Sequence, residues 1–224
     1  MVPRPDDGEI SYKGSGRLKG QKALITGGDF GMGRAAAIAY AREGADVAIN
    51  YLPAEEPDAK EPSILDITTE DFDATMKTNI YAPFWIFKAA LPHMPGGSAI
   101  IGTASEQAYD PSADLYDYAQ TKAATMNYVK SLAKQLGPKG IRVNGVAIGP
   151  IWTPLQVSGG ATQEKLKKFG GDTPLGNQVN PLNLLQFMFS LLLMMQVFLP
   201  ARFMVQVEEA ANLNDLTKYG FKRI

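Results

Sequence analysis

The stretch "KALITGGDFGMGRAAAIAYAREGADVAIN", residues 22 to 50, decides which fold is expected of this 224-residue chain. It opens with a short apolar run closed by glycines (22–28), which is typical of a buried strand. The alanine-rich segment 34–44 ends in Gly44 and predicts a helix with a glycine stop. A second apolar run, 45–50, predicts another buried strand. Strand, glycine loop, helix and strand form one βαβ unit, so the stretch predicts an α/β protein.

The rest of the chain continues this alternation of helices and strands. A long apolar-faced helix is expected to start at Thr69, before acidic residues, and to kink at Pro83. A second long helix is expected over 115–137, where glycine and proline stop it. Two more buried strands are expected at 97–105 and 141–149. Helices that alternate with buried strands indicate a parallel sheet.

Three regions of different character divide the chain. Residues 1–20 form a polar arm, rich in proline and glycine, without the apolar run of a signal peptide; we expect it to be solvated. Residues 21–176 form the α/β domain. Residues 177–224 have a different, atypical apolar character. Within them, the run 181–200 is long enough for a transmembrane helix, although polar residues interrupt it evenly.

Composition excludes several classes of function. With 45% hydrophobic residues the chain can build a full core, and a net charge of −1 without a basic stripe argues against nucleic acid as a partner. The absence of cysteine and the presence of one histidine argue against a metal site and favour a reducing compartment. We therefore expect a cytoplasmic protein with no metal ion.

The loop "TGGDFGMGRA" (26–35) joins the first strand to the first helix. Glycines at this place let the backbone approach a pyrophosphate, and the helix N-terminus adds N–H groups and a positive dipole end. The position therefore predicts a phosphate-binding loop. A tight turn that merely needs glycine is the alternative.

Tyr118 and Lys122 lie one helical turn apart on one face of the predicted helix. An ammonium beside a phenol favours the phenolate, as a tyrosine that transfers protons requires. The exposed face of an ordinary helix is the alternative, since one Tyr-x-x-x-Lys pair arises easily by chance. Ser105 ends a strand at the edge where parallel sheets bind ligands, although serine there is more often a cap or turn residue. Asn79 lies within the preceding helix, where a polar residue facing the core needs partners.

Together these pieces resemble the short-chain dehydrogenase/reductase family. The resemblance covers residues 8 to about 176, and Ser105 precedes Tyr118 by thirteen residues, the spacing usual in that family. The arm "SYKGSGRLKG" and the run that follows the glycine loop are closer to the subgroup of glucose and ribitol dehydrogenase homologues. Five elements in the right order carry the resemblance: the loop with Thr26, Gly27, Gly31 and Gly33; Asn79 in "TNIYA"; Ser105; the Tyr118 and Lys122 pair; and "GPIWT" (149–153).

The resemblance implies a Rossmann-like doubly wound parallel sheet and hydride transfer between a nicotinamide and a small carbonyl or alcohol substrate. It gives four catalytic residues their roles. Tyr118 exchanges the proton, and Lys122 holds the nicotinamide ribose and tunes the tyrosine. Ser105 bonds the substrate oxygen, and Asn79 supports a water relay to the lysine. A homo-oligomer is also implied by the family.

The same resemblance assigns the cofactor contacts. The second strand ends in Asn50 and Tyr51, with no acid to hold a ribose 2′-hydroxyl, and together with Arg34 this favours NADP over NAD. Thr153 and the backbone at Ile151 are expected to hold the carboxamide. The full set of cofactor residues implied in this way is Gly27, Gly31, Met32, Gly33, Arg34, Asn50, Tyr118, Lys122, Ile151 and Thr153.

The chain departs from the family in two places. About fifty residues that the family places near position 60, including the central strand of its doubly wound sheet, are missing, so the sheet is reduced in strand number. The tail from 177 does not match, and a one-base shift of reading frame near Gly176 gives a sequence that resembles the family C-terminus. A catalytically impaired, non-enzymatic remnant is therefore the first alternative, and a membrane- or partner-associated protein using 181–200 is the second.

Overall fold

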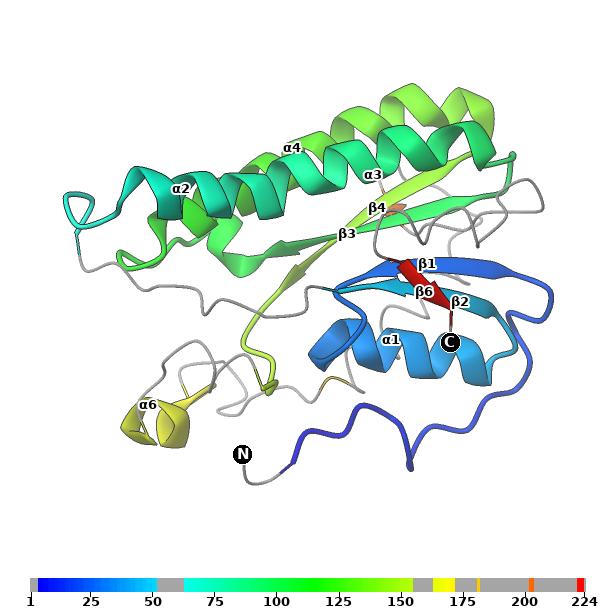
Figure 1. Cartoon of the computed structure of the whole chain (residues 1–224), viewed down its shortest axis with the longest axis horizontal. Coiled ribbons are helices and arrows are strands. Elements are labelled where there is room, and N and C mark those ends of the chain that lie inside the picture. The colour runs from blue at the N-terminus through cyan, green and yellow to red at the C-terminus, as the bar shows by residue number, and fades with distance from the viewer. Residues whose placement is uncertain are drawn as a thin grey trace. The chain divides into compact units, whose positions relative to one another are not determined.

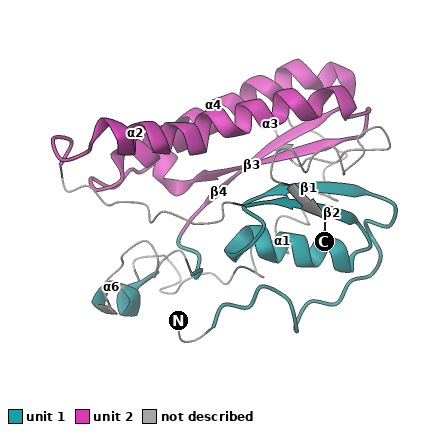
Figure 2. Cartoon of the chain, in the orientation of Figure 1, with its two compact units in different colours: residues 1–58, 150–195, 206–224 teal, residues 59–149, 196–205 magenta. Residues whose placement is uncertain are grey.

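The computed structural model describes residues 4–51, 63–154, 163–171, 181, 202–203 and 221–223. These residues fall into two compact units (Figure 2). Unit 1 comprises the described parts of 1–58, 150–195 and 206–224, and unit 2 those of 59–149 and 196–205. The domain boundaries expected at residues 20 and 176 remain predictions.

Unit 1 contains the βαβ motif predicted from the opening stretch (Figure 1). Strand β1 (Lys22–Thr26) leads through the glycine loop to helix α1 (Gly31–Arg42), which is followed by strand β2 (Asp46–Asn50). The two strands are parallel, with Lys22 opposite Asp46 and Thr26 opposite Asn50. Four alanines of α1 are buried, which lets the helix pack closely on both strands: Ala35, Ala36, Ala37 and Ala39. Strand β6 (Phe221–Arg223) pairs antiparallel with β2, and the short helix α6 (Gln163–Lys168) also belongs to this unit.

The N-terminal arm is attached to unit 1, so the prediction of a solvated arm is wrong. Tyr12 and Leu18 are buried at 8% and 6% exposure. Both residues bond to Glu43, which lies at the C-terminal end of α1 and has no exposed surface. The backbone N–H of Leu18 also donates to the carbonyl of Glu43, over 3.0 Å. A polar segment is therefore part of the folded unit because its hydrogen bonds reach a distant acid.

Unit 2 contains a second pair of parallel strands, β3 (Ala99–Ser105) and β4 (Arg142–Ile148). Strand β5 (Arg202–Phe203) pairs antiparallel with β4. Helix α4 (Tyr116–Leu136) packs on both β3 and β4, burying Val129, Leu132 and Leu136. Short 3₁₀ turns flank it, η3 (Glu106–Ala108) after β3 and η4 (Gly137–Lys139) at the end of α4.

The helix expected to start at Thr69 is interrupted before Pro83 rather than at it. Helix α2 (Thr69–Met76) begins at Thr69 as expected, and Thr68 caps it by accepting the Asp71 N–H over 3.1 Å. A π-helical segment η1 (Lys77–Tyr81) follows, then helix α3 (Ala82–Ala90) and the 3₁₀ turn η2 (Leu91–His93). No helix among the described residues is long and apolar enough to span a membrane. Of the apolar run 181–200, only residue 181 lies within the described residues.

The two pairs of parallel strands belong to separate three-stranded sheets, ordered β1-β2-β6 and β3-β4-β5. The α/β fold class with a reduced sheet is therefore confirmed. Within the described residues, β1 pairs with β2 in unit 1 and β3 pairs with β4 in unit 2. One edge of β1 and one edge of β3 thus lack a neighbouring strand among the described residues.

Candidate active site

The glycine loop of unit 1 contains two positions, Gly31 and Gly33, where a side chain would require the neighbouring atoms to move. A Cβ on Gly33 would lie 1.8 Å from the carbonyl oxygen of Gly27, so the first turn of α1 packs directly on the loop backbone. Gly31 has a φ of +54°, and a Cβ there would lie 3.1 Å from Cγ2 of Thr153. The structure therefore brings Thr153 to the loop, with Ile151 and Thr153 both buried at 6% exposure.

The N-terminal end of α1 has the electrostatics of an anion site. Phe30 occupies the N-cap without a side-chain hydrogen bond to the helix, and the first turn contains no acidic residue. The first N–H groups of a helix have no carbonyl partner within it, and they carry the positive end of the helix dipole. Met32 and Gly33, both half-buried, lie in this turn. The loop geometry and these donors fit the pyrophosphate of a dinucleotide.

The end of β2 lies beside this loop. The Asn50 carbonyl accepts the Gly28 N–H over 3.2 Å, and Asn50 and Tyr51 are half-buried. Sequence reasoning passed over Asp29, whose carboxylate Oδ1 is buried without a hydrogen-bond partner in the described structure. An acceptor of this kind in the loop is available to a donor on a ligand. The signal in the sequence was an acid between the glycines of a phosphate-binding loop.

Arg34, in the first turn of α1, is paired with an acid of the arm. Its Nε lies 3.3 Å from Oδ2 of Asp7, whose side chain is 9% exposed, against 41% for Arg34. Burial raises the pKa of Asp7 and Glu9 adds to this, whereas Arg34 lowers it. Sequence reasoning missed this contact, since nothing in the spacing of residues 7 and 34 indicates it.

The carboxylate of Glu43 is the centre of the contacts that hold the arm. It accepts hydrogen bonds from the Tyr12 hydroxyl, from Ser15 N and Oγ, and from Arg17 through its backbone N–H, Nε and Nη2. Hydrogen bonds from the Arg17 side chain, followed by those from Tyr12 and two backbone N–H groups, hold the pKa of Glu43 well below its usual range. Burial, with the bond to Glu43, raises the pKa of Tyr12 to about 12. Arg42 adds bonds to the Tyr12 and Glu9 carbonyls.

Unit 2 brings the predicted tyrosine and lysine to the strand that ends in the predicted serine. Tyr118 and Lys122 are half-buried on α4, and Nζ of Lys122 lies 5.1 Å from the Tyr118 ring centroid. The same Nζ donates to the Thr103 carbonyl over 3.2 Å, two residues before Ser105 on β3. Thr121, fully buried, anchors the turn by donating to the Tyr118 carbonyl over 2.7 Å.

Ser105 closes β3 and starts the turn η3. It is buried at 6% exposure, and its Oγ accepts the Gln107 N–H over 3.2 Å and donates to the Ile148 carbonyl over 3.4 Å. The turn role that serine commonly has at such a position is therefore present. Its hydroxyl lies at the carboxyl end of two parallel strands, since Ser105 and Ile148 are register partners.

Asn79 lies in the π-helical segment η1, which packs against α4. The Ala82 N–H donates to the Lys77 carbonyl, five residues earlier, as in a π-helix. Pro83 has no N–H, so it cannot give the carbonyl of Asn79 the bond that residue i+4 provides in an α-helix. π-Helical turns of this kind occur frequently at functional sites.

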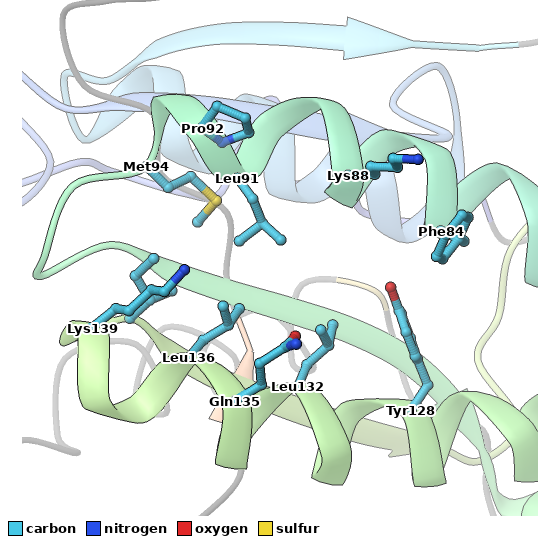
Figure 3. A pocket seen from close by; sticks show the side chains of 11 residues that line it. Phe84, Lys88, Leu91, Pro92, Met94, Tyr128, Leu132, Gln135, Leu136 and Lys139 are labelled. Atoms are coloured by element: carbon cyan, nitrogen blue, oxygen red, sulfur yellow. The ribbon is translucent and has the colours of Figure 1, made fainter.

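A separate cavity of about 560 Å³ lies in unit 2 between α3 and α4 (Figure 3). Apolar side chains such as Leu132 line it, together with Lys88 and Tyr128. Burial raises the pKa of Tyr128, so its phenol stays protonated at neutral pH. None of the predicted catalytic residues lines this cavity, which is therefore distinct from the site around Tyr118.

Comparison with known proteins agrees with this geometry. The profile of a family described as "Enoyl-(Acyl carrier protein) reductase" matches residues 57–198. An uncharacterized oxidoreductase, YghA of Escherichia coli (strain K12), is 47% identical over 236 residues, covering 82% of this chain and 80% of that protein. The chain belongs to the short-chain dehydrogenase/reductase family. This assignment confirms the resemblance seen in the sequence and makes the chain one of a family of oxidoreductases.

Two further similarities refine the assignment. The glucose and ribitol dehydrogenase homolog 2 of Arabidopsis thaliana is 35% identical, with 81% of this chain and 82% of that protein covered. The crystal structure of a short chain dehydrogenase from Burkholderia cenocepacia J2315 in complex with NADP matches with a TM-score of 0.68 and 27% identity. That match covers 79% of this chain and 91% of the other. The YghA alignment, at 236 positions, is longer than the 224 residues of this chain, as expected if an internal segment is missing here.

Proposed function

We propose that this chain is an NADP-dependent oxidoreductase that interconverts a small carbonyl compound and its alcohol, with Tyr118 as general acid and base. The observation that carries the proposal is the position of Lys122, whose Nζ lies over the Tyr118 ring and donates to Thr103 of the strand that ends in Ser105. One side chain thereby links the tyrosine to the strand with the serine. When bound, a reduced nicotinamide supplies the hydride for the carbonyl carbon.

The residues of unit 2 handle the proton in this proposal. Tyr118 gives its hydroxyl proton to the substrate oxygen as the carbonyl is reduced, and takes it back in the reverse direction. The Lys122 ammonium stabilises the tyrosinate that remains. Ser105 Oγ holds the substrate oxygen, which requires it to turn from its 3.4 Å contact with the Ile148 carbonyl. A water held at Asn79 returns the proton from solvent through Lys122.

The residues of unit 1 fit a dinucleotide. Gly33 and Gly31 let the Gly27 carbonyl and the Thr153 side chain pack against the N-terminal end of α1, whose N–H groups would bind a pyrophosphate. Thr153, whose side chain lies where a Cβ of residue 31 would be crowded, and the backbone at Ile151 would hold the carboxamide. Within the described structure, the cofactor residues Gly27, Met32, Arg34 and Asn50 belong to the same unit. NADP is the proposed cofactor because β2 ends in Asn50 without an acid, and because the Burkholderia relative binds NADP.

NAD is the second candidate cofactor, because Asp29 places a buried, unpartnered carboxylate oxygen in the loop. Such an oxygen can accept a hydrogen bond from a ribose 2′-hydroxyl, whereas it would repel a 2′-phosphate at the same position. Family membership favours an enzyme over a non-enzymatic remnant. A cytoplasmic location is proposed from the absence of cysteine.

NADPH is expected to bind more tightly than NADH to the full chain. The missing acid at the end of β2 removes both the repulsion of a 2′-phosphate and the bond to a 2′-hydroxyl. Titration of both cofactors, followed by nicotinamide fluorescence, measures the two dissociation constants under identical conditions. A clear preference for NADH would contradict the NADP assignment, and binding of neither cofactor would contradict the proposed function.

A homo-oligomer is proposed from aromatic side chains that α3 leaves exposed. Trp85 is 58% exposed and Phe84 is 42% exposed, with their rings in an edge contact at 5.0 Å. Exposed aromatic side chains that adjoin one another favour protein–protein contact. Sedimentation of the wild type and of Trp85→Ala would test this, since a monomeric wild type contradicts it.

A further inference from the structure

The ion pair between Arg34 and Asp7 joins the arm to the cofactor loop. Arg34 comes directly after Gly33, in the first turn of α1, and is the cation that favoured NADP in the sequence. Its Nε lies 3.3 Å from Oδ2 of Asp7. Asp7 Oδ1 is buried and has no hydrogen-bond partner in the described structure. Burial raises the pKa of Asp7, whereas two cations lower it, and Arg34 has a larger effect than Arg4.

The arm does not depend on this pair for its attachment. Glu43 accepts bonds from Tyr12, Ser15 and Arg17, and Arg42 donates to the Tyr12 and Glu9 carbonyls. All of these contacts lie at the opposite end of α1 from Arg34. Loss of the Asp7 charge therefore leaves the arm docked, and the pair with Arg34 can be altered separately.

An arginine that already faces a carboxylate attracts a second anion less strongly, because the two negative charges oppose each other. The Asp7 side chain is 9% exposed and that of Arg34 is 41% exposed. Solvent and salt therefore screen the charge of Asp7 less than they screen the charge of Arg34. The cation next to the glycine loop is therefore partly neutralised by the chain itself. This effect opposes the NADP preference expected from the end of β2.

We propose that Asp7 is a specificity-determining residue, which acts through Arg34 to weaken binding of the 2′-phosphate of NADP(H) and so lets NAD(H) compete. The proposal rests on the proposed nicotinamide-dependent function. It assigns the arm a role in cofactor choice that is separate from its role in stability.

The test measures dissociation constants of NADPH and NADH for the full chain and for Asp7→Asn. The variant should bind NADPH about fivefold more tightly, as expected for release of a partly exposed ion pair, and should bind NADH within about twofold of the wild type. The gain should shrink as ionic strength rises. An unchanged ratio of the two constants, or equal weakening of both, would overturn the proposal. A wild type that binds neither cofactor would instead refute the proposed function.

Asp6→Asn is the matched control. It removes the same charge one residue away, from a carboxylate that accepts bonds from Gly8 N at 2.8 Å and Ser11 Oγ at 2.6 Å within the arm. It should leave the ratio of the two dissociation constants unchanged. A gain for NADPH equal to that of Asp7→Asn would overturn the proposal, because the effect would then follow net charge and not the contact with Arg34.

Arg34→Gln removes the cation of the ion pair instead of the anion. It tests the proposal even if Asp7→Asn does not fold. It should weaken NADPH binding and leave NADH binding within about twofold, since it removes the cation and leaves the Asp7 charge in place. In the double variant, Asp7→Asn should no longer improve NADPH binding by fivefold. A full gain in the double variant would overturn the role of Arg34.

Discussion

Replacing Tyr118 with Phe is expected to lower turnover by at least about 10³-fold, the range for loss of a positioned acid or base. The hydroxyl acts in the transition state, so the dissociation constant of NADPH should change little. The contact of Lys122 with the ring and its bond to the Thr103 carbonyl do not use the Tyr118 hydroxyl, so these two contacts should persist in the variant. Initial rates of NADPH oxidation with a panel of aldehydes and ketones, together with cofactor titration, provide the measurement.

Tyr128→Phe is the control for this substitution. Tyr128 lies on the same helix α4 and faces the separate cavity between α3 and α4. The same loss of a phenol hydroxyl there should leave turnover close to that of the wild type. Substantial turnover by Tyr118→Phe, or equal losses in both variants, would contradict the role of Tyr118.

Replacing Glu43 with Gln is expected to lower the free energy of unfolding by roughly 2–4 kcal/mol. Removing one partner of a fully buried ion pair costs about 3–5 kcal/mol, and the 40% exposure of the Arg17 side chain reduces this. Chemical denaturation followed by circular dichroism would measure the loss at pH 7. Glu9→Gln makes the same change in the pair of Glu9, whose side chain is 29% exposed, with Arg4, at 77% exposure, where less than about 1 kcal/mol is expected.

The pH dependence of this loss has a definite sign. Because the folded pKa of Glu43 is lowered, its contribution is fully present above the unfolded pKa of about 4.3 and is lost as pH falls toward the folded pKa. The difference in stability between wild type and Glu43→Gln should therefore be constant near neutrality and shrink below about pH 4. A difference that does not change with pH would show that the charge of Glu43 is not what stabilises the arm.

The elements that the sequence predicts well are those specified by local pattern. The strand, glycine loop and helix of residues 22–42 follow from glycines and an alanine run that act over a few residues. Helix α4 likewise starts and ends within one residue of the range 115–137. The end of β3 at Ser105 is also predictable, because the apolar run before it stops there.

What the sequence did not reveal depends on contacts between distant residues. The arm looks solvated because its polar residues have no local partners, yet Tyr12 and Arg17 bond to Glu43, 31 and 26 positions away. The ion pair of Asp7 with Arg34 is likewise a contact between residues far apart in the sequence, which no local pattern predicts. Thr153 was assigned only through family resemblance, and its approach to Gly31 is a tertiary contact that no spacing rule indicates.

The interruption at η1 has a consequence for how this protein can change by mutation. In an α-helix, the N–H of residue 83 would bond the carbonyl of Asn79, but Pro83 has no N–H. The hydrogen bonding of this carbonyl therefore depends on the residue at position 83 as well as on position 79. A substitution at 79 removes the amide side chain but does not change the missing N–H at residue 83. A substitution at 83 by any residue other than proline restores an N–H that can close the helix onto that carbonyl. The hydrogen bonding of the backbone carbonyl of residue 79 is therefore altered by mutation at position 83, and substitutions at position 79 alone would not reveal this dependence.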